Sequence, residues 1–344
     1  MSTAKDVALK AGVSIATVAR IMNNDERYSY KEETRQAVLN AAEVLNYSTP
    51  SHRKQAKKEQ VITEERIILL VCAHMVTDAI DGAQRACDEL GYMLYIRKMR
   101  NFSDESFEQY LDDKRVKAVI FLDYIVNKDI VRKYPLLPMV QINEFTDANY
   151  INSITINETS GTREMTDYLV EKGRKRLCVV GFDYKEGEQI PAADRRTDGA
   201  RMSLMKAGLD IRPDFFVSIP AQALEQNDEK PFIRFRKLLQ LPEGERPDMV
   251  YCNGARVSAV CMRYIQEEGL RVPEDIAIAC TSTDDHSSKS VLLATSPQIS
   301  GIFAPMKEMG YEAVRTAQVF IDRPNSLRRR VVLPYSIIYR ESTP

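Results

Sequence analysis

Short apolar runs alternate with amphipathic stretches through most of this 344-residue chain. Runs such as Ile67–Cys72 and Val116–Leu122 contain almost no polar residue, and a helical pattern at residues 78–90 separates two of them. Continuous apolar runs joined by helices are typical of parallel strands that are buried on both faces of a sheet. The pattern repeats after a polar interruption between residues 142 and 159. We therefore predict two similar α/β lobes, each with an open parallel sheet.

The alternation places the elements as follows. Strands are expected at residues 67–72, 92–96, 116–122, 138–142, 176–181, 248–252, 275–280 and 329–339, and helices at 78–90, 102–113, 159–171, 196–206, 232–239, 255–268 and 304–321. We assign residues 66–157 and 290–325 to the first lobe, and 158–289 with 326–344 to the second. In open sheets of this class, ligands bind beyond the carboxyl ends of the strands, so a cleft between the lobes is expected to hold one.

The first 47 residues have a different character and read as three short helices. Thr3 and Asp6 form a capping-box start, and Gly12 is suited to the left-handed turn that ends the first helix. Ser14 caps the second helix, and Ser29 is expected to open the third. This arrangement predicts a helix-turn-helix headpiece whose second helix fits the major groove of DNA.

Residues 48–65 form a polar, basic stretch that we interpret as a hinge. The first 60 residues hold ten Lys or Arg and seven Asp or Glu, a net charge of +3, and the remaining 38 and 42 give −4. A basic head on an acidic body is suited to phosphate contact by the head alone. Arg53 and Lys54 in the hinge are expected to follow phosphates or enter a narrow minor groove.

Composition also excludes several classes of protein. The 14 glycines never occur as G-x-G, and neither a P-loop nor a G-x-S-x-G motif is present, so we expect neither an enzyme nor a nucleotide cofactor. The three histidines are isolated and the six cysteines form no C-x-x-C pair, so we expect no metal site. Because no apolar stretch approaches a membrane span and no signal segment follows Met1, a cytoplasmic location is expected.

The order of headpiece, basic hinge and two α/β lobes resembles the lactose/galactose repressor (LacI/GalR) family of bacterial transcription regulators. The motifs that carry the resemblance are Lys5-Asp6-Val7-Ala8, Ala11-Gly12-Val13-Ser14, Thr34-Arg35, Leu45-Asn46-Tyr47, Arg196 with Gly199, and Val272-Pro273-Glu274-Asp275-Ile276. The resemblance implies a type I periplasmic-binding-protein-like body. It also implies a homodimer on operator DNA, and a small effector, usually a sugar or a molecule the size of a nucleobase, in the cleft.

Residue roles at the DNA end follow from the same resemblance. In the family, positions matching Ile15, Ala16 and Arg20 meet base edges. Arginine pairs with guanine O6 and N7, and apolar side chains touch thymine methyl groups. Ser14, Thr17 and Asn23 are better suited to phosphates or to single polar contacts. A core position for Ile15 is the alternative. The hinge lacks the leucine with which family members wedge the minor groove open, so weaker kinking is expected.

At the effector end, Arg196 matches a family position that clamps sugar hydroxyls or a carboxylate, and a surface salt bridge with a nearby aspartate is the alternative. The other candidate contacts, which all follow predicted strands, are His74, Asn253, Ser282 and Asp284. For His74, a loop histidine without a binding role is the alternative. The family's polar pair at Asn253 is broken by Gly254.

Together these features predict a repressor of carbohydrate-utilisation genes that is released or tuned by a small molecule, most simply a sugar. Departures from the family pattern in the cleft keep a second hypothesis open, in which a protein partner controls the regulator.

Overall fold

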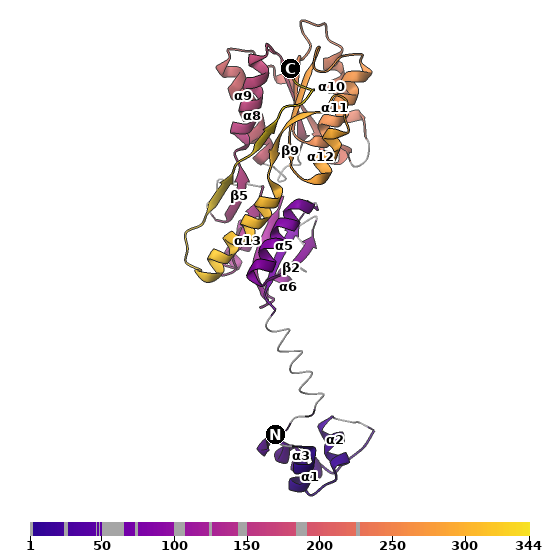
Figure 1. The fold of residues 1–344 in the computed structure, drawn as a ribbon, viewed down its shortest axis with the longest axis vertical. Coiled ribbons are helices and arrows are strands. Elements are labelled where there is room, and N and C mark those ends of the chain that lie inside the picture. The colour runs from indigo at the N-terminus through magenta and orange to yellow at the C-terminus, as the bar shows by residue number, and fades with distance from the viewer. Residues whose placement is uncertain are drawn as a thin grey trace. The chain divides into compact units, whose positions relative to one another are not determined.

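The chain separates into two compact units, Met1–Glu65 and Arg66–Pro344, shown in Figure 1. The structure is a computed structural model. It describes residues 3–23, 27–45, 47, 49, 65–72, 75–99, 107–123, 126–143, 150–183, 191–224 and 228–344. Nearly all of the predicted hinge therefore lies outside the described residues.

The headpiece contains α1 (Ala4–Ala11), α2 (Ile15–Met22) and α3 (Glu32–Val44). Thr3 and Asp6 form the predicted capping box, and Gly12 ends α1 with a φ of 67°. In α2, the Ser14 side chain accepts a hydrogen bond from the backbone N–H of Thr17. A small apolar core joins the three helices and is built from Val7, Ala8, Val18, Ile21, Val38, Ala41 and Ala42.

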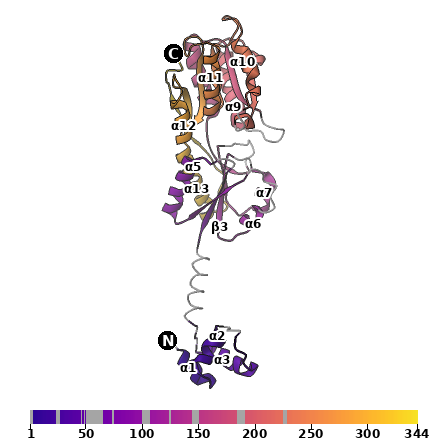
Figure 2. The same ribbon diagram turned by 90° about the vertical axis from the view of Figure 1, so that its right-hand side faces the viewer.

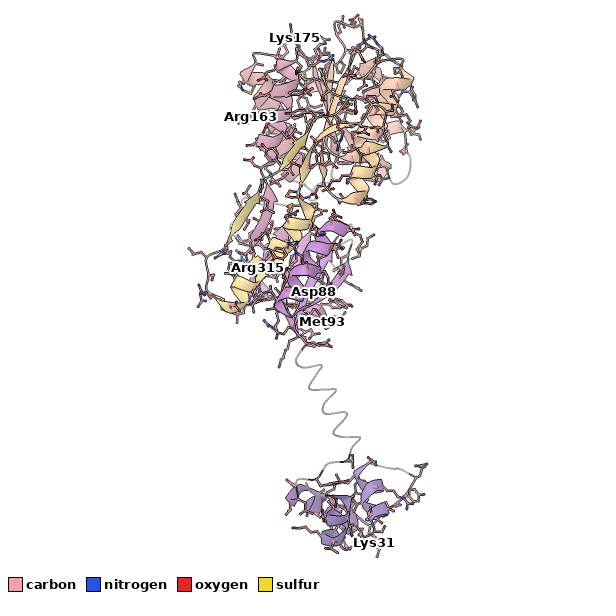
Figure 3. The ribbon with its side chains drawn as sticks, in the orientation of Figure 1. Lys31, Asp88, Met93, Arg163, Lys175 and Arg315 are labelled. Atoms are coloured by element: carbon pink, nitrogen blue, oxygen red, sulfur yellow. The ribbon has the colours of Figure 1, made fainter. Side chains whose placement is uncertain are left out.

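The start of α3 differs from the prediction. Its N-cap is Lys31, labelled in Figure 3, and not Ser29. Lys31 has no side-chain oxygen, so it makes no side-chain capping hydrogen bond. Glu32 and Glu33 in the first turn provide the negative charge that a helix amino terminus favours.

The first lobe of the body is built on a sheet with strand order β11-β5-β4-β3-β1-β2. All of its pairings are parallel. The strands are β1 (Ile67–Cys72), β2 (Met93–Lys98), β3 (Val116–Leu122), β4 (Met139–Ile142), β5 (Asn152–Ile156) and β11 (Arg330–Leu333). As Figure 2 shows, α5 (Thr77–Leu90) and α13 (Met306–Asp322) cover one face, and α6 (Glu108–Leu111) and α7 (Lys128–Lys133) cover the other.

The second lobe has strand order β12-β10-β9-β8-β6-β7. Its strands are β6 (Leu177–Asp183), β7 (Phe216–Pro220), β8 (Met249–Cys252), β9 (Ala277–Thr283), β10 (Ser300–Ala304) and β12 (Ser336–Ile338), and only β12 runs antiparallel to its neighbour. One face packs against α8 (Glu158–Glu171) and α9 (Pro191–Lys206). The other packs against α10 (Ile233–Leu239), α11 (Ala255–Glu267) and α12 (His286–Leu293). Short 3-10 turns are η2 (Pro213–Phe215), η3 (Ala221–Leu224) and η4 (Lys230–Phe232). The predicted fold class, two lobes with mostly parallel sheets behind a helical headpiece, is confirmed.

The predicted lobe boundaries are wrong near the carboxyl end. Strand β10 pairs with β9 in the second sheet, so α13 is the part of residues 290–325 that joins the first lobe. The single strand expected at residues 329–339 is two strands, β11 in the first sheet and β12 in the second. Pro334 separates them, because proline has no N–H to donate to a ladder. The chain thus crosses between the lobes after β5, after β10 and after β11.

Sequence reasoning missed β5, β7, α12 and β10. Strand β5, with the sequence Asn-Ser-Ile-Thr-Ile, is fully buried although three of its five residues are polar. Strand β7 lies at the sheet edge, and its exposure alternates along the strand. Neither strand has the continuous apolar run by which the other strands were found.

Helices α5 and α13 lie side by side in Figure 1 and approach each other closely. A Cβ atom on Gly82 would lie 1.8 Å from the carbonyl oxygen of Lys307, and one on Gly310 would lie 1.9 Å from that of Ala79. The two glycines therefore allow backbone-to-backbone contact at this crossing.

Candidate functional site

The exposed face of α2 carries the residues predicted to meet DNA bases. The Ile15 side chain is 50% exposed, whereas Val18 is fully buried in the headpiece core. Ala16 is also exposed. The structure therefore excludes the core alternative for Ile15 within the headpiece. An apolar side chain at the start of this helix is placed where it could touch a thymine methyl group.

Polar groups surround this apolar start. The hydroxyls of Ser14 and Thr17 lie 2.9 Å apart, and Asn23 is the C-cap residue of α2. Arg20, in the last turn, stacks on the ring of Tyr28, with 3.9 Å between its Cζ atom and the ring centroid. Five of the six headpiece candidates thus lie within or directly before α2, and Asn23 follows it.

Three predicted contacts fall outside this description. Arg53 and Lys54 of the hinge, and His74 after β1, lie outside the described residues. Their proposed roles stay predictions from the sequence.

In the second lobe, Arg196 on α9 forms a bidentate ion pair with Glu158 on α8. Its Nε and Nη2 atoms donate to the two carboxylate oxygens at 2.8 and 2.9 Å. The side chains are only 15% and 1% exposed, respectively. Glu158 comes from a neighbouring helix, and this pair is buried in the lobe and not at its surface.

Close packing of α8 and α9 brings these two charges together. A Cβ atom on Gly199 would lie 2.4 Å from the carbonyl oxygen of Thr159, so glycine at this position lets the helices approach. The buried hydroxyl of Tyr251 bonds to Thr162 and Thr281 nearby. Burial is the main reason that the pKa of Tyr251 is raised, so the phenol stays neutral. The hydroxyls of Thr162, Tyr251 and Thr281 thus form a polar layer between α8 and the sheet.

Asn253, directly after β8, is 5% exposed, and its Oδ1 atom has no hydrogen-bond partner among the described residues. A Cβ atom on Gly181 would lie 2.9 Å from Asn253 Nδ2, so the glycine leaves room for the amide. Asn253 lines a pocket of about 290 Å³ between α9, β6 and β7. The lining residues are Val179, Gly181, Phe182, Thr197, Asp198, Arg201, Phe216, Val217, Ser218 and Asn253. An unpaired buried acceptor beside aromatic rings and hydroxyls is suited to a ligand that donates a hydrogen bond.

Ser282 and Asp284 lie at the carboxyl end of β9. Ser282 is buried, and the carboxylate of Asp284 accepts a 2.8 Å hydrogen bond from the N–H of Met306, the first residue of α13. Burial raises the pKa of Asp284, and this hydrogen bond opposes the rise. Burial also acts on Asp285, but hydrogen bonds from Ser287, Thr283 and Ser288 outweigh it and lower the pKa. Asp284 therefore connects the second lobe to the helix that returns to the first.

Sequence reasoning missed a polar pair in the first lobe. Asp123 follows β3 and Asn143 follows β4, with left-handed φ values of 52° and 70°. Asn143 Nδ2 donates to Asp123 Oδ1 at 2.7 Å, which orients the amide. Its buried Oδ1 atom has no partner among the described residues. The available signal was a polar residue directly after each buried strand, at the edge where ligands bind in such sheets.

The pair Asp123–Asn143 and the residue Asn253 therefore supply an unpaired amide oxygen at the carboxyl edge of each sheet. The pocket beside Asn253 is lined by neither Arg196, Ser282 nor Asp284. In the part of the chain that is described, no group of His, Cys, Asp or Glu has the arrangement of a metal site. No helix there is both long and apolar enough to cross a bilayer.

Two family models match the chain. Residues 3–50 match the model described as bacterial regulatory proteins, lacI family, and residues 166–343 match that of a periplasmic binding protein-like domain. The first match covers the helices and the beginning of the hinge, and the second covers most of the second lobe and the crossings at the carboxyl end.

Curated relatives match over nearly the whole chain. The ribose operon repressor of Escherichia coli K12 is 27% identical over 349 residues, covering 99% of this chain and 100% of the relative. The HTH-type transcriptional repressor CytR of the same strain is 26% identical over 324 residues, covering 91% and 88%. The repressor MelR of Bacillus subtilis is 27% identical over 355 residues, covering 98% and 96%.

Solved structures share the fold. A transcriptional regulator CelR–cellobiose complex aligns with a TM-score of 0.67 at 21% identity, covering 99% of this chain and 100% of the other. The lac repressor dimer bound to operator and an anti-inducer aligns with a TM-score of 0.65 at 20% identity, covering 99% of each.

Proposed function

Because this chain belongs to the LacI family of bacterial regulatory proteins, we propose that it represses carbohydrate-utilisation genes by binding operator DNA through α2. Its curated relatives are DNA-binding transcriptional repressors, which are not enzymes. The observation that carries the proposal is the exposure of Ile15 and Ala16, with half-buried Arg20 in the last turn, on a helix whose opposite face packs in the headpiece core.

In this proposal Arg20 pairs with a guanine, and Ile15 and Ala16 contact thymine methyl groups. Ser14, Thr17 and Asn23 bind phosphates or make single polar contacts, which fix the register of the helix. Arg53 and Lys54 of the hinge add phosphate contacts that make binding depend on salt. Two such headpieces, supplied by a homodimer, would read the two halves of a near-palindromic operator.

Selection of duplexes from a random-sequence library by the full-length protein tests DNA recognition. We expect an enriched, near-palindromic sequence that the Arg20→Ala variant fails to enrich. If the purified protein enriches no sequence at all, the proposed function is wrong.

Replacing Lys54 with Ala is expected to reduce the slope of log affinity against log salt concentration by about 0.9.

We also propose that the body binds a small effector, most simply a sugar, which releases or tunes DNA binding. The support is the pair of unpaired amide oxygens on Asn143 and Asn253, since sugar hydroxyls are hydrogen-bond donors. Arg196, Ser282, Asp284 and His74 are proposed as further contacts. One similar protein is named as a ribose operon repressor and another as a regulator in complex with cellobiose. Both names are consistent with a sugar as the effector.

Calorimetry of the full-length protein against a panel of neutral sugars tests this part. We expect one sugar to bind, with loss of binding in Asn253→Ala and retained affinity of that variant for the selected operator. The double variant Arg196→Leu, Glu158→Leu, which removes both charges of the buried pair, is expected to abolish the response to the sugar while leaving DNA binding intact. If no sugar in the panel binds, and a specific protein from the same cell changes the affinity for the operator, control by a protein partner replaces this proposal.

Effector and operator need not touch to influence each other. If the effector binds better to the conformation with weaker DNA affinity, each ligand reduces affinity for the other by the same factor. A difference of a few kcal/mol between the two conformations is sufficient for near-complete release.

A further inference from the structure

We propose that Tyr28 is a positioning residue for base reading, and that its ring holds the guanidinium of Arg20 ready for a guanine. The proposal rests on the function proposed for α2 and adds a residue that neither the motifs nor the family match assigns. It also predicts that sequence selectivity, and not general DNA affinity, depends on this ring.

The contact joins two different segments of the headpiece. Arg20 lies in the last turn of α2, and Tyr28 lies in the connection that leads to α3. The Arg20 Cζ atom is 3.9 Å from the centroid of the Tyr28 ring, well inside the roughly 6 Å range of cation–π attraction. The Tyr28 side chain is not part of the headpiece core and is 46% exposed.

Stacking and base reading use different parts of the guanidinium. The 3.9 Å distance from the Arg20 Cζ atom to the ring centroid suits a ring stacked on the guanidinium plane, whereas the N–H donors lie in that plane and point outward from its edge. Guanine O6 and N7 require two parallel donors from one edge. The same arginine can therefore remain on the ring while it pairs with a base.

The ring also limits the freedom of a long side chain. Arginine loses substantial rotamer entropy when it is immobilised, and an ordered side chain has already lost part of it before DNA arrives. Measured cation–π contributions correspond to about twofold at exposed sites and about thirtyfold where the pair is desolvated by a partner. We expect the effect at a DNA interface to fall within this range.

The test uses full-length protein and a duplex selected by it from a random-sequence library. Affinity is measured for this duplex and for a copy in which the G·C pair that depends on Arg20 is changed to A·T. Discrimination is the ratio of the two affinities. Tyr28→Leu keeps apolar bulk but lacks the π face, and Tyr28→Phe keeps the face without the hydroxyl.

We expect Tyr28→Leu to reduce discrimination by about threefold to thirtyfold and Tyr28→Phe to retain it within about twofold. Affinity for an unselected random duplex, and the salt dependence of that affinity, should be unchanged because no charge is lost. In an Arg20→Met background, Tyr28→Leu should have no further effect on discrimination, since the cation is absent.

Three results would overturn the proposal. Unchanged discrimination in Tyr28→Leu would mean that the ring does not position Arg20. Increased affinity would mean that the ring withholds Arg20 from DNA. An equal loss in the Arg20→Met background would assign the effect to the fold of the headpiece or to a direct Tyr28 contact. Failure of the wild type to select any duplex is a different result, and it would instead reject the proposed function.

Discussion

Arg20 in the headpiece is held by an aromatic ring, whereas Arg196 in the second lobe is held by a carboxylate. The centroid of the Tyr28 ring lies 3.9 Å from the Cζ atom of Arg20, and Glu158 accepts hydrogen bonds from the Nε and Nη2 atoms of Arg196. Edge donors are what an arginine offers to a base, a sugar or a carboxylate. The two sites show that arginines singled out by similar sequence reasoning are placed by neighbours of different chemistry, an aromatic ring in one unit and a buried carboxylate in the other.

The largest expected effect concerns the buried pair. Glu158→Ala should lower the free energy of unfolding of the body by about 3–5 kcal/mol, because it removes the bidentate partner of a buried guanidinium. Urea unfolding followed by circular dichroism measures this. Asp198→Ala is the matched control: its partner Arg201 is 3.7 Å away and both side chains are about half exposed, so a loss below about 1 kcal/mol is expected. Equal losses would show that the Arg196 pair is no different from a surface contact.

The corresponding change in the headpiece should act on DNA and not on the body. Arg20→Lys is expected to weaken binding to the selected duplex by about 1–3 kcal/mol, because lysine cannot make the bidentate contact with guanine. Fluorescence anisotropy measures the affinity, and the unfolding of the body serves as a control that should not change. A lysine variant that binds as tightly as the wild type would remove Arg20 from base reading.

Packing offers a further contrast between the units, since the headpiece core is made of side chains and α5 packs on α13 through backbone. Gly310→Ala should destabilise the body by about 1–3 kcal/mol, because the added methyl group would meet the carbonyl oxygen of Ala79. Gly244 has no neighbouring atom within 4 Å of a Cβ position, so Gly244→Ala is the control. Similar thermal transitions for the two variants would argue against a tight crossing.

The smallest expected effect is the pH dependence at Asp284 and Asp285. The pKa of Asp284 is raised above 3.8, so its ionisation costs stability as pH increases through the shifted pKa. Asp284→Asn should therefore be most stabilising near neutral pH, relative to the wild type, and lose this advantage in acid. The pKa of Asp285 is lowered, so its contribution is present above 3.8 and is lost as pH falls through the folded-state pKa. Asp285→Asn should destabilise most near neutral pH; parallel pH profiles for the two variants would contradict both assignments.

Local patterns predicted the parts of the molecule that depend on neighbours in sequence. Thr3 with Asp6, Ser14 with Thr17 and the apolar strands β1 and β3 all formed as expected, because capping and burial follow short periodicities. The headpiece face was predictable because buried Val18 fixes which side of α2 is exposed.

Long-range partners could not be predicted in the same way. Glu158 is 38 residues from Arg196, and only the packing of α8 against α9 selects it over nearer aspartates. Asn143 was missed because its pairing with Asp123 depends on which strands are neighbours in the sheet. Strand β5 was missed because Asn152 is buried by hydrogen bonds to the backbone around it and not by apolar character.

The three crossings between the lobes have a consequence for how the protein is made. The outer strand of the first sheet, β11, is separated by more than 170 residues from its neighbour β5, and all strands of the second lobe except β12 are encoded between them. During synthesis from the amino terminus, the first lobe therefore begins earlier, but both sheets receive their last strand only near the carboxyl end, β11 first and then β12. Loss of the last 20 residues would remove one edge from both sheets at once, so a premature stop there would disable the entire body.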